Sequence, residues 1–168
     1  TNPAIKILSL LTYTSIILHT LLTLFLAFQS KSARPINYAV SSGSENSRWA
    51  SRNMPLLGTI VLVFIVIHMK SFWYEMHWGD IGNDPWGNRD IYTVTIVAFR
   101  ELWYTAFYVL SMAVLGFHLC HGISSAFQTI GIKTKKYLGP IEKFASTVSI
   151  IVPIAFASIP IILYLRSL

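Results

Sequence analysis

Four histidines lie inside long apolar stretches of this 168-residue sequence: His19, His68, His118 and His121. An ionisable side chain is costly in such surroundings and by default marks a functional site. Imidazole nitrogens ligate metals and transfer protons, so these are the chemistries to consider first. A plainer alternative is open, in which each ring hydrogen-bonds a neighbouring helix and stabilises packing. The elements that carry the four histidines help to decide between these readings.

The composition places the chain in a membrane. Hydrophobic residues make up 54% of the sequence and charged residues only 12%. A soluble domain of this length has too much surface to bury so many apolar side chains. Four stretches are long enough to cross a bilayer as helices: residues 3–28, 54–74, 94–129 and 141–165. We therefore predict an all-α, integral membrane helical bundle with four transmembrane helices in a single domain, 1–168.

Local signals refine these helices. Pro153 and Pro160 lie inside the fourth stretch and should kink it, because proline removes a backbone hydrogen bond. Gly131 follows the third stretch, where a helix C-cap is expected. Cys120 is the only cysteine, which excludes a disulfide framework and a cysteine-based zinc or iron–sulfur site.

Charged residues in the connections set the orientation. Lysine and arginine dominate the first and third connections, at Lys31, Arg34, Arg48, Arg52, Lys133, Lys135, Lys136 and Lys143. The second connection is mainly acidic and is flanked by Trp73, Trp78, Trp86 and Trp103. The positive-inside rule places the basic connections in the cytoplasm and the tryptophans in an outer aromatic belt. In a membrane protein, the net charge of +6 is no sign of nucleic-acid binding.

Helix rise gives the depth of each histidine. His19 lies nine residues before position 28, and His121 lies eight residues before position 129. Both rings are therefore about 12–14 Å from the cytoplasmic boundary, at 1.5 Å per residue. Two helices that hold imidazoles at one level could bind a haem iron between them. Such a haem has no open coordination position and carries electrons.

The other two histidines lie at other depths. His68 comes fourteen residues after position 54, or about 21 Å from the inner boundary, which marks a second, outer level. His118 lies about 4.5 Å outside His121 and is a candidate for supporting a ligand. Gly116 and Gly122 could leave room for a flat macrocycle, or could serve close helix packing.

These residues carry a family resemblance. Residues 47–54 (SRWASRNM), 64–68 (FIVIH), 72–74 (FWY) and 116–128 (GFHLCHGISSAFQ) are together specific, although each alone is weak. The sequence resembles the succinate dehydrogenase/fumarate reductase cytochrome b subunit, in the b558-like form with one large anchor polypeptide and two haems b. The likeness covers essentially the whole chain and is nearest to the branch found in bacteria of the Bacteroidetes type.

The resemblance implies five transmembrane helices and two bis-histidine haems b. His19 and His121 match the ligands of the proximal haem, and His68 matches one ligand of the distal haem. The fourth ligand belongs to the family's first helix, which is not in the printed sequence and which we expect to precede it. The resemblance also implies a flavoprotein subunit, an iron–sulfur subunit, and a quinone, menaquinone, as electron acceptor. The chain would be a multi-pass subunit of that enzyme in the bacterial inner membrane, without dicarboxylate chemistry of its own.

Candidates for a haem propionate or quinone contact are Arg52, Ser51, Trp49 and Gln128. Arginine forms bidentate pairs with carboxylates, although Arg52 also satisfies the positive-inside rule without any ligand. Two other functions stay open: the di-haem cytochrome b anchor of a hydrogenase or formate dehydrogenase, and a haem-free transport or structural membrane protein.

Overall fold

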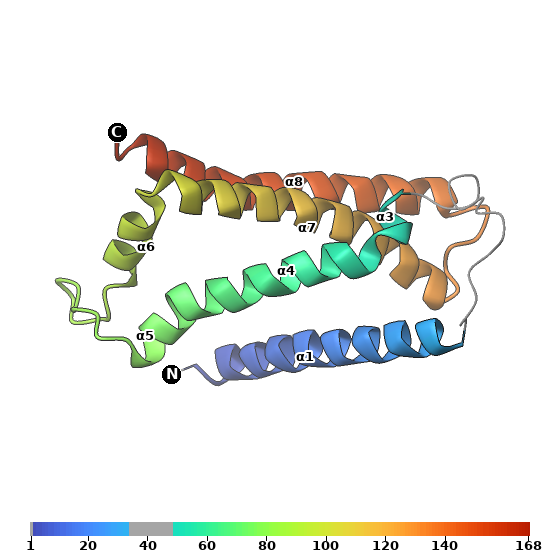
Figure 1. The fold of residues 1–168 in the computed structure, drawn as a ribbon, viewed down its shortest axis with the longest axis horizontal. Helices are drawn as coiled ribbons and strands as arrows, with labels where there is room; N and C mark the ends of the chain where they lie inside the picture. The colour runs from blue at the N-terminus through green and yellow to red at the C-terminus, as the bar shows by residue number, and fades with distance from the viewer. Residues whose placement is uncertain (1, 34–48) are drawn as a thin grey trace. The chain divides into compact units, whose positions relative to one another are not determined.

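The computed structural model describes residues 2–33 and 49–168. All of the long elements in these residues are helices (Figure 1). Its contacts form two compact units, Thr1–Glu45 and Asn46–Leu168. Four helices in the described residues are long and apolar enough to span a membrane. The predicted all-α bundle with four such helices is confirmed.

The first unit contains one helix, α1 (Pro3–Ser32). The Asn2 side chain caps it by accepting a hydrogen bond from the Ala4 N–H at 2.9 Å, and proline follows at the first helical position. Thirty residues give a helix of about 45 Å, longer than a hydrocarbon core. The helix has no buried residue, so its apolar side chains are available to lipid or to other helices.

The second span is built from four consecutive pieces: α3 (Trp49–Arg52), α4 (Met54–His68), a π-helical segment η1 (Met69–Tyr74), and α5 (Glu75–Trp78). The last three form one continuous membrane-length helix. It ends at Gly79, whose N–H donates to the Glu75 carbonyl at 3.1 Å. An ideal Cβ at Gly79 would lie 2.7 Å from the Glu75 Cα, so a larger residue does not fit there.

The third span begins later than expected. A separate helix, α6 (Ile91–Phe99), precedes α7 (Leu102–Thr129), whereas the sequence pattern had suggested one helix from position 94. The break follows from local bonds: the Arg100 N–H donates to the Val97 carbonyl, and the Thr105 hydroxyl donates to the Phe99 carbonyl at 3.2 Å. Apolar composition continues across the break, which is why hydropathy alone does not detect it.

The predicted cap at Gly131 is present. Gly131 has φ of 77°, its N–H donates to the Gln128 carbonyl, and the Ile132 N–H donates to the Phe127 carbonyl. These two bonds form a Schellman motif, in which glycine avoids the steric cost of positive φ. The last span, α8 (Leu138–Leu165), continues as one helix through its two prolines.

Helices α4, α7 and α8 lie side by side in the second unit, with α7 in contact with both others (Figure 1). An ideal Cβ at Gly58 of α4 would meet His118 of α7 at 3.6 Å, while further along the pair His68 meets Tyr108. On the other side, a Cβ at Gly116 would lie 3.0 Å from the Ser149 carbonyl oxygen of α8. Both pairs are antiparallel, and this register fixes which side chains face each other.

Candidate functional site

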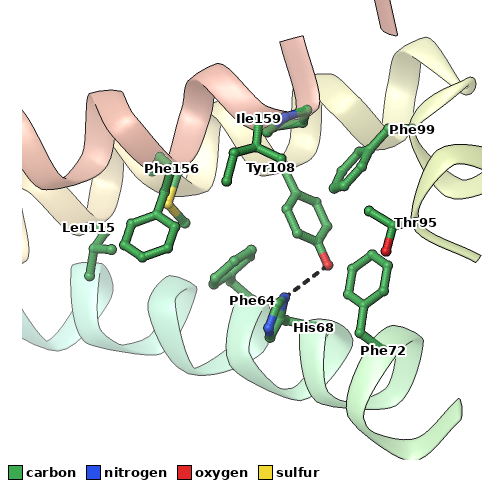
Figure 2. Close-up of a pocket in the computed structure, with 11 residues that line it drawn as sticks. Phe64, His68, Phe72, Thr95, Phe99, Tyr108, Leu115, Phe156 and Ile159 are labelled. Carbon is green, nitrogen blue, oxygen red and sulfur yellow. Dashed lines mark hydrogen bonds between the residues drawn. The ribbon is translucent and has the colours of Figure 1, made fainter. Parts of the chain in front are cut away.

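The imidazole of His68 lies in a row of aromatic rings on α4 and η1. Phe64 and Phe72, four residues before and after it, have ring centroids 5.7 and 5.4 Å from the imidazole. Side chains four residues apart on a helix share a face, which explains the row. Figure 2 shows the three rings pointing toward α7 and α8. The histidine itself remains exposed along part of its side chain, so the ring is also accessible from outside.

A cavity of about 400 Å³ lies on this face, between α4, η1, α6, α7 and α8 (Figure 2). Its wall is mostly aromatic and aliphatic and includes Phe64, Phe72, Phe99, Met112, Leu115, Phe156, Ile159 and Pro160. The polar groups on the wall are those of His68, Thr95 and Tyr108. Apolar walls with a few convergent polar groups are typical of small-molecule and cofactor sites, whose volumes run from about 300 to 1,000 Å³.

Two tyrosines extend the polar part of the site. The Tyr108 hydroxyl lies 3.4 Å from Nδ1 of His68, and the Tyr104 hydroxyl lies 3.0 Å from that of Tyr108. Both tyrosines are buried, with 6% and 8% of their surface exposed. Phe64 and Phe99 each hold a ring edge-on to Tyr108 at 5.0 Å. The imidazole and the two hydroxyls are thus joined in a row within apolar surroundings.

The sequence pattern does not single out Tyr104 and Tyr108. Their spacing of four residues in an apolar helix is a usable signal, because buried phenols need hydrogen-bond partners. This spacing does not show which helix supplies the hydrogen-bond partner of the phenols. The sequence does not indicate the π-helical turn at 69–74 either, since its residues are ordinary helix residues. Such turns are frequent at functional sites, and this one begins directly after His68.

The two histidines of α7 have different surroundings. His118 packs over Gly58, where α4 approaches α7 closely. His121 lies one turn further along α7 and is half-buried. It is thirteen residues from Tyr108, the α7 residue level with His68, so the levels of His68 and His121 differ by about 20 Å. Within the second unit, the two ligand candidates His68 and His121 therefore lie at two separated levels.

The remaining candidates are His19 in the first unit and four residues at helix ends of the second unit: Trp49, Ser51, Arg52 and Gln128. His19 is an exposed residue of α1, and its pairing with His121 stays a prediction. Trp49 packs edge-to-face on Phe117 of α7 at 5.9 Å. Ser51 is half-buried, whereas Arg52 and Gln128 are exposed. Arg48 and Ser47, which belong to the resemblance, lie outside the described residues.

Gly116 and Gly122, the two glycines that could make room for a macrocycle, have different surroundings. Gly116 faces α8, where the Ser149 carbonyl and Pro153 would meet an added Cβ at 3.0 and 3.6 Å. This supports the packing interpretation for Gly116. At Gly122 nothing described lies within 4 Å of such a Cβ, so no described residue packs closely on this glycine.

At the opposite end of the second unit, an arginine ties the connection between α5 and α6 to the helix end. The half-buried Arg89 guanidinium donates to the Glu75 carbonyl at 3.1 Å and to the Gly79 carbonyl. Asp84 accepts from the N–H groups of Trp86 and Asn88, which forms the turn before it. These bonds fix the connection to the end of α5.

No protein-family model matches the chain, and neither a curated protein nor a solved structure matches it significantly.

Proposed function

We propose that this chain is the membrane-anchor cytochrome b subunit of a succinate:quinone oxidoreductase. The observation that carries the proposal is His68, a membrane-embedded histidine on the wall of an aromatic cavity between spanning helices. An ionisable side chain inside a spanning helix is costly and by default marks a functional site. Apolar ring surfaces around it suit a flat, largely apolar cofactor.

The side chains present fit a haem b. Among residues 2–33 and 49–168, no three or more histidine, cysteine or acidic side chains gather as a metal cluster. A porphyrin needs none, because it supplies the equatorial ligands of iron itself and takes only axial ligands from the protein. Nδ1 of His68 faces a hydroxyl, so Nε2 is the nitrogen left for iron.

A second haem would be held near His121. Its depth, about 20 Å from that of His68, separates the two sites by more than half of a bilayer core. His19 is the proposed partner of His121, because both lie about 12–14 Å from the basic ends of their predicted spans. A haem b with two histidine ligands exchanges electrons and leaves no position for oxygen.

The proposed path runs between the two ends of the bundle. The end with the basic residues would face the cytoplasm and dock an iron–sulfur subunit and a flavoprotein subunit. Arg52 and Ser51, beside Trp49, are proposed to contact a haem propionate or the quinone there, with Gln128 on the adjoining helix end. The chain would thus pass electrons between the iron–sulfur subunit and menaquinone in a bacterial inner membrane.

Isolation of the intact complex tests this function. The full-length chain should be affinity-purified from its native membrane in mild detergent, and its partners identified by mass spectrometry. We expect a subunit with covalent flavin and an iron–sulfur subunit, with succinate-dependent reduction of a menaquinone analogue. A hydrogenase or formate dehydrogenase catalytic subunit in their place would contradict the proposal, as would a preparation without redox partners.

A further inference from the structure

The row His68, Tyr108 and Tyr104 is more specific than packing requires. Phenylalanine would fill the same space at positions 104 and 108, among rings such as Phe64, Phe72 and Phe99. Burying two hydroxyls in this environment costs free energy unless each finds a partner. The structure satisfies both with one another and with the imidazole nitrogen of His68.

If His68 ligates a metal, the donor and the acceptor of each hydrogen bond in the row are also fixed. A ligating imidazole uses one nitrogen for the metal and donates its other N–H to a neighbouring acceptor. Nδ1–H would then donate to the Tyr108 oxygen, and the Tyr108 hydroxyl would donate to the Tyr104 oxygen. The distance of 3.4 Å between Nδ1 and the Tyr108 oxygen is long, and a small ring rotation would shorten it.

We propose that Tyr108, itself oriented by Tyr104, is the positioning residue of His68: its oxygen accepts a hydrogen bond from Nδ1–H, which leaves Nε2 for the iron. The inference rests on the proposed haem function and deepens it. The two tyrosines are one turn apart on a single helix and are buried, so they hold the acceptor rigidly. An acceptor on Nδ1–H increases electron donation by the imidazole, which favours ferric over ferrous iron.

The test compares redox titrations of the purified complex, followed at the haem-b absorption band. Tyr108→Phe removes the acceptor and keeps the ring. The haem at His68 should then favour the ferric state about tenfold less, which raises its midpoint potential by about 59 mV. Tyr104→Phe should shift the same potential in the same direction by less. Tyr92→Phe changes a tyrosine that is 70% exposed and should leave it unaltered.

The outcomes separate the two claims. Wild-type complex without a haem-b band contradicts the proposed function, and the inference with it. If the wild type binds haem, an unchanged potential in Tyr108→Phe overturns the positioning role alone. If that variant does not assemble, Tyr104→Phe decides, and an unchanged potential there overturns it. A shift of the other haem, the one lost in His121→Ala, would likewise overturn it.

Discussion

His118 of α7 lies directly over Gly58 of α4, with 3.6 Å between its Cε1 and the position of a Cβ at residue 58. The contact joins two antiparallel spanning helices, α4 and α7. His118 therefore serves the α4–α7 interface, while His121, one turn away, is left as the ligand candidate.

Replacing His118 by alanine should weaken this interface and spare the cofactor. We expect a loss of about 1–3 kcal/mol in stability, since a packed ring with polar nitrogens is removed. Haem content per chain should stay at the wild-type value. Thermal unfolding in detergent with haem quantitation measures both. If His118→Ala loses a haem while His121→Ala retains it, the assignment of the ligand is wrong.

Gly116→Ala should destabilise the pair α7–α8. Its added methyl group would lie 3.0 Å from the Ser149 carbonyl oxygen, and Pro153 leaves little room to move. Overpacking of this kind costs about 1–3 kcal/mol. Gly139→Ala is the control, because it lies in α8, the other helix of this pair, and meets nothing described within 4 Å. Equal melting temperatures of the two variants would refute the close approach at Gly116.

Arg89 should be needed for order in the connection between α5 and α6. Arg89→Ala leaves the half-buried carbonyls of Glu75 and Gly79 without their guanidinium donor. Each lost bond to a charged group costs about 1.5–3 kcal/mol. Limited proteolysis should then cut residues 79–90 faster. Arg100→Ala, at an exposed arginine, is the control, and equal cleavage rates in both variants would argue against the brace.

Asp90 should make the start of α6 sensitive to acid. Its carboxylate accepts from the Thr93 hydroxyl at 2.6 Å and from the Thr93 N–H at 3.0 Å, and these bonds hold the pKa of Asp90 below its usual 3.8. A lowered folded-state pKa means that the cap contributes stability above pH 3.8. This contribution is lost as the pH falls below that value and through the folded-state pKa.

Hydrogen exchange of the α6 amides between pH 6 and pH 3 measures this effect, after correction for intrinsic exchange. Protection should fall at the acid end in the wild type and stay level in Asp90→Asn, which keeps a capping oxygen without a titrating proton. The same acid-dependent loss in both proteins would show that another group is responsible.

The sequence pattern predicts the four spanning helices and the cap at Gly131, because length, hydropathy and a positive-φ glycine are local signals. It does not predict the π-helical turn after His68 or the break at Arg100, since neither changes composition. The partnership of His68 with Tyr108 depends on the register between α4 and α7. That register is fixed by close contacts such as Gly58 with His118, which involve residues sixty positions apart.

A depth counted from the sequence assumes that the helix ends lie at one level. Counting from positions 54 and 129 separates His68 and His121 by about 9 Å, whereas the register in the structure gives about 20 Å. The difference arises because α7 extends beyond the start of α4. A helix-by-helix count from sequence has no means of detecting that offset.

The haem-b content of the purified complex tests the central claim most directly. Reduced-minus-oxidised optical spectra and haem quantitation should show haem b in the wild type. His68→Ala and His121→Ala should each lose a different haem, distinguishable by midpoint potential, while His118→Ala keeps the wild-type content. A wild-type complex without a reduced haem-b band would contradict the account.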